Sequence, residues 1–458
     1  MARAYLGDLG KVIKRLEGMG RLTRIHSEVD PVHELAALAA RMAGRDAAIL
    51  FENVKGHKAP VLCGLYSSKP LLMDLLGSKG ETPDRFIAAR VAQWQQHPVA
   101  PLVKKTGPVK QVTQNKPDVT RLPVPTHALA DGGAYFDAAV VLARDPETGV
   151  RNASIHRTQV IDATTLALLI DPGRHLGDYL EKARNLGQPL PITINIGVGP
   201  SVYFAAATPS GAAPLDSDEL GVASAFQESP LELVKGNMSD VELIGRAMYA
   251  MECDLLPGET EMEGPFAEVT GLYALPARRP RVKIKAIHHR RKPIFHTQLS
   301  GTGGFSMVGM MGGAQMMELL PKQVPGILDV HMTPGASGLM HAVIQMTPTQ
   351  SGWPKNAIMA AFGQFSSLKM VTVVDEDVDI RDPDDVEWAM ANRLIPSTGI
   401  HLVQASQGLG LNPSFPDGIG TKIGFDCTRA FPHEEKDDRV TFQEVSLADY
   451  KIEYAAKH

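Results

Sequence analysis

Two glutamates five positions apart are the first residues of this chain that could do acid–base chemistry. Glu263 and Glu268 flank a Gly-Pro pair in the segment EGPFAE. A helix brings together side chains three or four positions apart, and a strand puts side chains five apart on opposite faces. Pro265 also disfavours the interior of a helix. A bend at Gly264–Pro265 could bring the carboxylates together, so the segment is either a solvated turn or a built pair of acids.

A second candidate is the segment NASIHR, residues 152–157, which has the character of a β-strand. In a strand, Asn152, Ser154 and His156 share one face. Arg157 falls on the opposite, otherwise apolar face, where a buried cation needs a carboxylate partner. An exposed arginine on an edge strand explains the same pattern equally well.

Two more polar residues follow along the chain. His175 comes eighteen residues after Arg157, behind a Pro-Gly turn, and Glu219 lies in LDSDELG, which opens an expected helix. Acids in the first turn of a helix stabilise its positive end, so capping explains Glu219 without a ligand. Neither residue indicates a site by itself.

Other motifs favour structural roles. The Gly-rich GTGGFSMVG, at 301–309, lacks the P-loop lysine, and Ser306 breaks the dinucleotide pattern, so packing or a pocket wall is favoured. VDEDVDI, at 374–380, lacks the EF-hand glycine and favours an acidic loop after a buried strand. HHRRK, at 288–292, follows an alternating basic strand and favours a solvated surface.

The elements that must position these residues fall into three stretches. Residues 8–19, 32–44 and 83–98 have helical patterns, with short strands between the second and third. A proline-punctuated connector from Pro98 to Pro125 then predicts a domain boundary near residue 115.

The middle of the chain, from about 135 to 300, is rich in short strands and favours a barrel or a sandwich. SVYFAAA, at 201–207, is one expected strand, and VELIGRAMYAM, at 241–251, is an expected helix. Beyond residue 300, strands and helices alternate in an α/β pattern. SLADYKIEYAAK, at 446–457, favours a terminal helix for oligomer contacts.

Bulk properties limit the class of protein. The chain has 458 residues, a net charge of −5 and 44% hydrophobic residues, as expected for a multidomain globular protein. The acidic balance argues against a nucleic-acid binder that neutralises phosphates. Three distant cysteines indicate neither a zinc ribbon nor a disulfide framework. The absence of a signal-peptide pattern or a long apolar stretch makes the cytoplasm the expected location.

Taken in order, the motifs resemble one family. N-x-x-I-x-R, a histidine eighteen residues on, a glutamate opening a helix and E-G-P-[FY]-x-[ED] are similar to the UbiD family of reversible decarboxylases. The resemblance covers nearly the whole chain and extends to PLELVK, KNAIMAAFG, VDEDVDI and TKIGFDCT, in family order. The segment ATPSGAAPLD is not a close match.

The resemblance implies a multidomain α+β and α/β fold. Residues 1–115 would form an N-terminal α+β domain, and residues 116–305 a central split β-barrel of the flavin-reductase type that binds prenylated FMN. Residues 306–458 would form a C-terminal α/β and oligomerisation domain with a terminal helix.

The resemblance also implies site residues. Arg157, Glu263 and Glu268 match the catalytic Glu-Arg-Glu network, in which Glu263 holds Arg157 and Glu268 donates and accepts the proton. Metal ligands would be Asn152, His175 and Glu219, a donor set that suits manganese or magnesium. Further expected cofactor contacts are Ile155, Arg157, Arg174 and Lys355, and expected substrate contacts are His296 and Gln298.

The implied reaction is the reversible, non-oxidative decarboxylation of an aromatic, heteroaromatic or α,β-unsaturated acid through a covalent prenylated-FMN adduct. A divalent metal and a potassium ion are the implied ions, a flavin prenyltransferase is the implied cofactor supplier, and a dimer or hexamer is the implied assembly. Two alternatives stay open: an oxidoreductase that uses ordinary FMN on a split barrel, and a non-catalytic member. An intact set of Arg157, Glu263 and Glu268 argues against the second.

Overall fold

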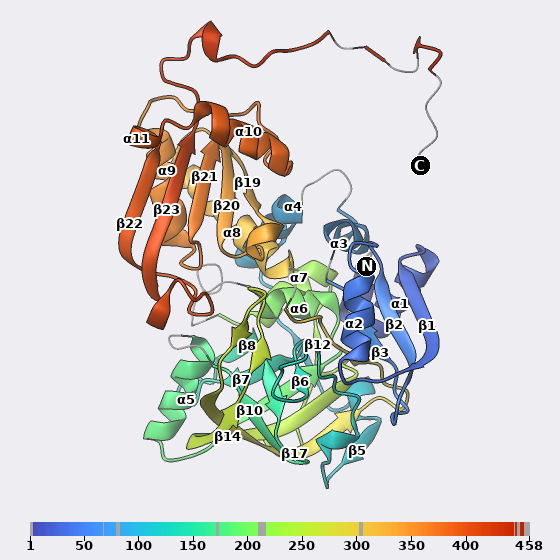
Figure 1. Cartoon of the computed structure of the whole chain (residues 1–458). Helices are drawn as coiled ribbons and strands as arrows, with labels where there is room; N and C mark the ends of the chain where they lie inside the picture. The colour runs from blue at the N-terminus through green and yellow to red at the C-terminus, as the bar shows by residue number, and fades with distance from the viewer. Residues whose placement is uncertain are drawn as a thin grey trace.

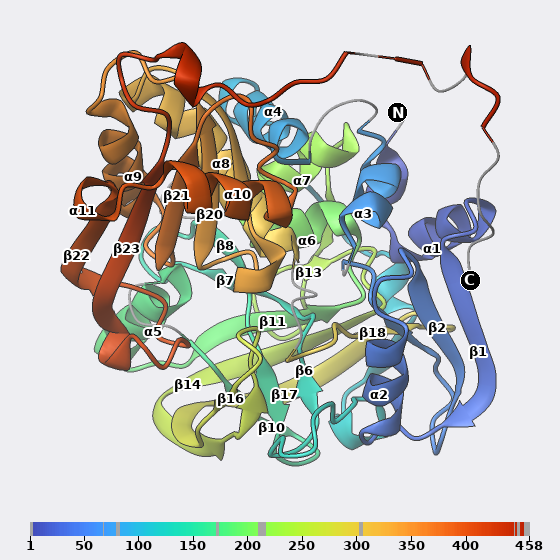
Figure 2. The same cartoon turned by 45° about the horizontal axis from the view of Figure 1, so that its top comes forward.

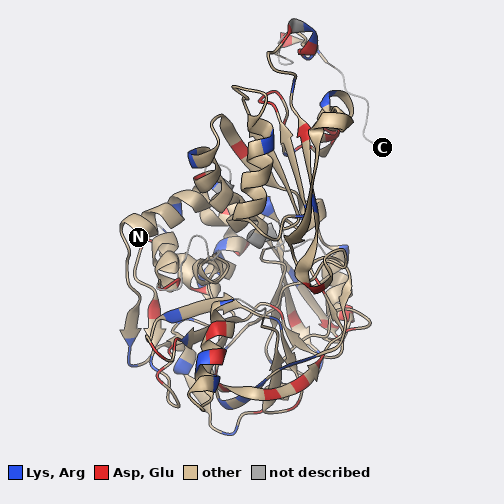
Figure 3. Cartoon of the chain, turned by 90° about the vertical axis from the view of Figure 1, so that its left-hand side faces the viewer, with Lys and Arg blue, Asp and Glu red and all other residues tan. Residues whose placement is uncertain are grey.

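The computed structural model describes residues 3–66, 68–78, 83–170, 174–208, 217–301, 306–443, 445–446 and 449–452. The chain forms an N-terminal α+β part, a central β-rich part with helices on one side, and a C-terminal α/β lobe (Figure 1). The multidomain α+β fold expected from the sequence is therefore confirmed. Acidic and basic residues are interspersed over the molecule (Figure 3).

The N-terminal part is a small mixed sheet with helices. Its elements are α1 (Leu9–Gly18), β1 (Leu22–Val29), α2 (Glu34–Arg41), β2 (Ala48–Val54), β3 (Val61–Cys63), α3 (Lys69–Leu76) and α4 (Pro83–Gln96). All four apolar residues on the expected face of α1 are buried: Leu9, Val12, Ile13 and Leu16. The fourth strand of the sheet, β18 (Phe295–His296), comes from far along the chain and pairs with β3.

The central part has one large antiparallel sheet, two smaller sheets and three helices. Its strands are β4 (Leu102–Lys104), β5 (Val112–Gln114), β6 (Tyr135–Phe136), β7 (Val140–Arg144), β8 (Arg151–Ile155), β9 (Thr158–Val160), β10 (Thr165–Leu168), β11 (Leu190–Ile196), β12 (Glu232–Val234), β13 (Leu243–Ile244), β14 (Tyr249–Glu263), β15 (Phe266–Ala267), β16 (Tyr273–Ala274) and β17 (Ala277–His289). Its helices are α5 (His175–Asn185), α6 (Pro200–Ala206) and α7 (Leu220–Gln227).

The strand order shows why this sheet curls. The nine strands run β6-β9-β10-β17-β14-β11-β7-β8, with β5 added to β17. β8 is thus the last strand at one end and β9 the second strand at the other, yet only His156 and Arg157 connect them. Because a residue spans at most about 3.5 Å, the two ends of the sheet must approach each other. The sheet is therefore an incompletely closed barrel, as expected, and Arg157 lies at its seam.

Two expected elements of the central part are wrong. SVYFAAA forms helix α6, not a strand, because Pro200 fits the first helical turn and a short apolar run suits either a buried helix or a strand. VELIGRAMYAM does not form a helix; it contributes β13 and the start of β14. Gly245 lies so close to the Glu232 carbonyl that a Cβ atom would be 2.8 Å from its oxygen, a strand-to-strand approach.

The C-terminal lobe is a five-stranded mixed sheet between helices. Its elements are α8 (Ser306–Gln323), β19 (Ile327–Met332), β20 (His341–Met346), α9 (Trp353–Gln364), β21 (Met370–Val374), α10 (Pro383–Arg393), α11 (Pro396–Gly399), β22 (Ile400–Gln407) and β23 (Ile419–Cys427). The strand order is β19-β20-β21-β23-β22.

The faces of this sheet follow the strand alternation. Ala342 and Ile344 pack in the cluster with α8 and α9, whereas Val343 between them packs in the cluster with α10 on the other face (Figure 2). The Gly/Met segment that begins at residue 301 forms helix α8 from Ser306 onward. Residues 302–305 of this segment lie outside the described residues.

The expected terminal helix over 446–457 is not seen in the part that the structure describes. Tyr450, Lys451 and Ile452 are outside any helix, and residues 453–457 lie outside the described residues. In the described ranges, no helix is both long and apolar enough to cross a bilayer.

Candidate active site

Arg157 joins the two glutamates of EGPFAE at the barrel seam. Its Nη2 donates to Glu263 Oε2 at 2.8 Å, and its Nη1 contacts Glu268 Oε1. All three side chains are buried, and Glu263 has no exposed surface. The guanidinium also lies over the Phe266 ring, 5.1 Å from its centroid. The structure thus brings the three expected catalytic residues together around one buried cation.

The bend that allows this geometry begins where β14 ends, at Glu263. Gly264 has a φ of +99°, which favours glycine, and the Gly264–Pro265 peptide bond is cis. Gly132 packs so closely on this bend that a Cβ atom there would lie 2.2 Å from the Gly264 oxygen. Gln159 fixes both segments, because its Nε2 donates to Gly132 O and its Oε1 accepts from Gly264 N.

Tyr135 is a site residue that no sequence motif indicated. Its hydroxyl donates to Glu263 Oε1 at 3.0 Å, on the carboxylate oxygen that Arg157 does not use. Burial and the neighbouring Glu263 raise the pKa of the phenol, so it stays a donor. Arg279 Nε is a further cation, 3.6 Å from Glu263 Oε2. Tyr135 lies more than a hundred residues before Glu263, and Arg279 lies fewer than twenty residues after it. Only the fold could reveal that both side chains contact Glu263.

The three expected metal ligands also meet. Asn152 Nδ2 donates to Glu219 Oε1 at 2.9 Å, and His175 Nδ1 lies 3.2 Å from the same oxygen and 3.4 Å from Asn152 Nδ2. Glu219 precedes α7 but makes no side-chain capping bond; Asp218 Oδ1 accepts from Leu220 N instead. Glu219 therefore does not cap α7 through a side-chain hydrogen bond. Its second oxygen accepts from Ala153 N at 3.3 Å.

The strand alternation expected for NASIHR is confirmed for Asn152, Ser154 and His156. Ser154 Oγ donates to Asn152 Oδ1 at 3.0 Å and lies 2.9 Å from His156 Nε2, so the three side chains share a face. Arg157 differs from the expectation, because β8 ends at Ile155 and the arginine lies in the connection between strands.

The expected cofactor contacts lie in three places. Ile155 ends β8 beside the Asn152 cluster, and Arg174 is the exposed residue directly before α5 and His175. Lys355 is exposed in the first turn of α9 in the C-terminal lobe. No described contact joins Lys355 to the Arg157 or the Asn152 cluster.

His296 and Gln298 lie on and after β18, where the N-terminal sheet meets the barrel. His296 is buried, and neither of its ring nitrogens has a hydrogen-bond partner among the described residues. Burial lowers the pKa of this imidazole to about 4, so it is neutral near pH 7. Tyr66 and Tyr203 stack on each other with their ring centroids 4.5 Å apart, and both rings lie roughly perpendicular to the His296 imidazole.

A buried network holds the segment after His296. Asp137 accepts from Thr297 Oγ1 at 2.8 Å and from Gln298 N at 2.8 Å, and His127 Nδ1 lies 3.3 Å away. Burial raises the pKa of Asp137 to about 7, although these donors oppose the shift. Asp137 and His127 are thus further residues that the motifs did not indicate.

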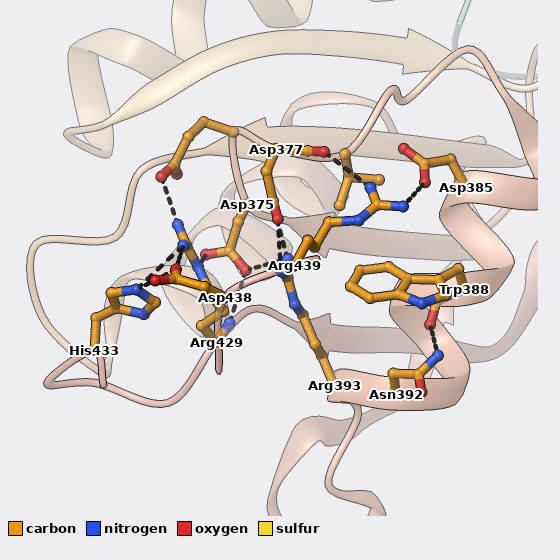
Figure 4. A network of polar contacts seen from close by, with 12 residues as sticks. Asp375, Asp377, Asp385, Trp388, Asn392, Arg393, Arg429, His433, Asp438 and Arg439 are labelled. Atoms are coloured by element: carbon orange, nitrogen blue, oxygen red, sulfur yellow. Dashed lines mark hydrogen bonds and ion pairs between the residues drawn. The ribbon is translucent and has the colours of Figure 1, made fainter. Parts of the chain in front are cut away.

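The acidic segment VDEDVDI forms no metal site in the described structure. Asp375 and Asp377 pair with Arg393 at 3.0 and 2.7 Å, and Arg429 also approaches Asp375 (Figure 4). These arginines neutralise the acids, as expected for a structural loop. Over the described residues, no group of three or more His, Cys, Asp and Glu side chains could hold a metal. The Asn152 cluster contains only two residues of these types.

Family comparison agrees with this geometry. Models of the 3-octaprenyl-4-hydroxybenzoate carboxy-lyase match the N-terminal domain at residues 13–91, the Rift-related domain at 101–303 and the C-terminal domain at 305–427. The chain belongs to the UbiD family. UbiD-family members are carboxy-lyases, so the expected enzyme class, a decarboxylase, is confirmed.

Two curated UbiD relatives are similar over most of their length. An uncharacterized protein in the cooM 5′ region of Rhodospirillum rubrum is 54% identical over 442 residues, 96% of each chain. Anhydromevalonate phosphate decarboxylase of Methanothermobacter thermautotrophicus is 35% identical over 424 residues, 92% of this chain and 97% of that protein.

A solved UbiD-class structure has the same fold. HmfF from Pelotomaculum thermopropionicum, in complex with FMN, is 38% identical with a TM-score of 0.90, covering 97% of this chain and 100% of that chain. An evolved dimeric form of the same enzyme, in complex with prFMN, is 36% identical with a TM-score of 0.86 over the same shares. The central split barrel of this chain is therefore the UbiD fold.

Proposed function

We propose that this UbiD-family decarboxylase uses prenylated FMN to remove carbon dioxide reversibly, and without net oxidation, from a flat unsaturated acid. The observation that carries the proposal is the buried set of Arg157, Glu263 and Glu268 at the barrel seam. Support for the cofactor comes from HmfF, whose structures contain FMN and prFMN. Support for the reaction comes from the anhydromevalonate phosphate decarboxylase relative.

The residues present fit a flavin and a substrate. The buried polar atoms without a hydrogen-bond partner among the described residues include both ring nitrogens of His296 and Nε of Arg157. Such groups are costly unless a ligand satisfies them. Ile155, Arg174 and Lys355 are proposed flavin contacts, and a flavin prenyltransferase is the proposed source of the cofactor. When bound, the prenylated flavin would supply the electron sink that decarboxylation needs.

The residues also fit a divalent metal. Asn152, His175 and Glu219 converge within hydrogen-bond distance of one another, and a buried carboxylate is stabilised by a cation. An amide oxygen and nitrogen exchange places by rotation about χ2, so Asn152 can offer oxygen to an ion. Manganese or magnesium suits this donor set, and would tie the flavin phosphate to the barrel. The family resemblance also implies a potassium ion, which we include in the proposal.

The two glutamates have different surroundings and therefore different proposed roles. Glu263 receives Arg157 and Tyr135 on separate oxygens, so it serves as the fixed counter-ion. Glu268 Oε1 has only the Arg157 contact among the described residues. Glu268 is the proposed group that gives a proton to the substrate carbon and takes it back in the reverse direction. Arg157 orients both carboxylates and offers Nε to the reacting centre.

The surroundings of His296 favour a flat substrate. The neutral imidazole can donate one hydrogen bond and accept another, and Gln298 adds an amide two residues on. Tyr66 and Tyr203 supply an aromatic surface beside it. We therefore favour an aromatic or heteroaromatic acid, with His296 and Gln298 as substrate contacts. An α,β-unsaturated aliphatic acid is the second candidate class, which the anhydromevalonate phosphate decarboxylase relative supports.

The test is co-expression with a flavin prenyltransferase, followed by an assay of carbon dioxide release over aromatic, heteroaromatic and acrylic acids. Turnover of one aromatic class is expected, and turnover of aliphatic enoic acids alone would contradict the substrate assignment. Mass spectrometry of the bound flavin separates this function from that of an ordinary FMN oxidoreductase. Unmodified FMN that a hydride donor reduces, with no decarboxylation, would favour the oxidoreductase.

The domain limits at residues 115 and 305 and a homo-oligomeric assembly also remain proposals. One hydrophobic cluster runs through the N-terminal and central parts and includes Met310, Met311 and Ala314 of α8, whereas the rest of the C-terminal lobe has clusters of its own. This difference supports a boundary near residue 305 more strongly than one near residue 115. The evolved dimeric form of HmfF supports assembly in the family.

A further inference from the structure

Behind the Asn152 cluster lies a second, fully polar cluster that the proposed chemistry does not use. Arg151 donates to Glu242 through Nε at 3.2 Å and Nη2 at 3.1 Å, and its Nη1 pairs with Asp218. Arg151 and Glu242 are buried. Burial raises the pKa of Glu242, but the bonds from Arg151 and Arg144 outweigh it and lower that pKa overall. Glu242 is therefore a stable anion.

Two residues of this cluster are sequence neighbours of expected metal ligands. Arg151 immediately precedes Asn152 in β8, and Asp218 immediately precedes Glu219 at the start of α7. Alternation along β8 turns the Arg151 side chain away from the face of Asn152. Arg151 is therefore outside the group of expected ligands, and any effect on them must pass through the backbone.

Two separate links join β8 to the start of α7. On one side, Asn152 and the Ala153 amide hold the Glu219 carboxylate. On the other side, Arg151 holds Asp218, while its two bonds to Glu242 fix the orientation of the guanidinium. The start of α7 cannot shift along β8 without breaking an ion pair in which the arginine is buried, which is costly.

We infer that Arg151 is a positioning residue for the divalent metal, because its ion pair with Asp218 sets the spacing between Asn152 and Glu219. This inference rests on the proposed function, in which those two residues hold the metal. Residues that hold metal ligands in place typically change metal affinity by about 10- to 100-fold when they are removed.

The sign of the effect distinguishes positioning from simple electrostatics. Removing a cation close to a metal site strengthens metal binding if charge alone acts. Positioning makes the opposite prediction, namely that Arg151→Met weakens binding. Arg144→Met is the matched control: the Arg144 side chain also bonds Glu242, but its other bond is to Gly149 O, and among the described contacts it makes none to Asp218.

The experiment uses the full chain, co-expressed with a flavin prenyltransferase, stripped with a chelator and titrated with Mn²⁺ while free Mn²⁺ is followed by electron paramagnetic resonance. Arg151→Met is expected to bind at least about tenfold more weakly, and Arg144→Met within about twofold of wild type. Circular dichroism checks the fold. If Arg151→Met does not fold, Arg151→Lys decides, because it keeps the charge but loses the fork; at least about threefold weaker binding is expected.

Two failures are distinguishable. If the wild-type chain takes up no Mn²⁺, or Glu219→Gln binds it equally well, the proposed metal site is wrong and this inference falls with it. If the wild type binds and Glu219→Gln does not, but the Arg151 variant that folds binds as tightly as wild type, only the role of Arg151 is overturned.

Discussion

Arg157 and Glu263 form an ion pair in the protein interior, with Nη2 and Oε2 2.8 Å apart and no exposed surface on the glutamate. The pair is separated by 106 positions in the sequence. A buried pair of this kind constrains both partners, because an unpaired charge in a low-dielectric interior is strongly destabilising. The pair therefore fixes Arg157 at the barrel seam, where Glu268 contacts its other nitrogen.

Replacing Glu263 with Gln removes the fixed counter-ion of Arg157. We expect the free energy of unfolding to fall by about 3 kcal/mol, because the buried Arg157 loses its charged partner. We expect kcat to fall by at least about 100-fold, because Glu268 is then the sole carboxylate partner of Arg157 and is held by it. Urea unfolding and steady-state kinetics measure the two quantities. Wild-type values for both would show that the pair has neither role.

Replacing Glu268 with Gln has a different expected signature. The variant keeps the Arg157–Glu263 pair, so its unfolding free energy changes less than that of Glu263→Gln. It cannot transfer a proton, so product formation and deuterium exchange at the product carbon both stop while flavin remains bound. Nuclear magnetic resonance of the product in heavy water measures the exchange. Exchange at the wild-type rate would refute the acid–base assignment.

Tyr135→Phe tests the residue that the motifs missed. The lost bond is to a buried carboxylate, so we expect unfolding free energy to fall by about 1.5 to 3 kcal/mol, with a roughly tenfold lower kcat. Tyr273→Phe is the control, since that hydroxyl accepts one bond from Ala130 N and the residue is exposed. Equal effects of the two substitutions would show that Tyr135 is only a packing residue.

Asp137→Asn has an effect on stability that depends on pH. Burial raises the pKa of Asp137 from 3.8 to about 7 in the folded protein, so the folded state binds the proton more tightly than the unfolded state. Its contribution to stability is therefore present at low pH and is lost as pH rises through 7. Between pH 8 and pH 6 the wild type gains about 1.4 kcal/mol from this group, and the variant does not.

Urea unfolding at pH 6 and pH 8 measures this difference, and comparing wild type with variant cancels the contributions of titrating groups that are distant from Asp137. The same change in unfolding free energy in both proteins would show that Asp137 does not titrate in this range. Because Asp137 holds Thr297 and Gln298, we also expect KM to rise in the variant at pH 8 while flavin content stays constant.

Local patterns identified a large part of this molecule. The apolar face of α1, the α/β alternation after residue 300 and the shared face of Asn152 and Ser154 all follow from periodicity, which depends only on near neighbours. The ordered motifs were enough to identify the UbiD family and to select Arg157, Glu263, Glu268, Asn152, His175 and Glu219. Periodicity failed where it is ambiguous: α6 and the segment that forms β13 are short apolar runs whose structure is decided by tertiary pairing.

Only the tertiary structure decided how those residues meet. No local pattern indicates that β8 and β9 lie at opposite ends of one sheet, which is why it curls and places Arg157 at the seam. Tyr135, Asp137 and Arg151 carry no recognisable motif, because a residue that bonds to a distant partner needs only the right position and one hydrogen-bonding group. The sequence by itself determined which side chains can do the chemistry; the packing of distant strands determined which of them touch, since a buried charge is stable only beside its partner.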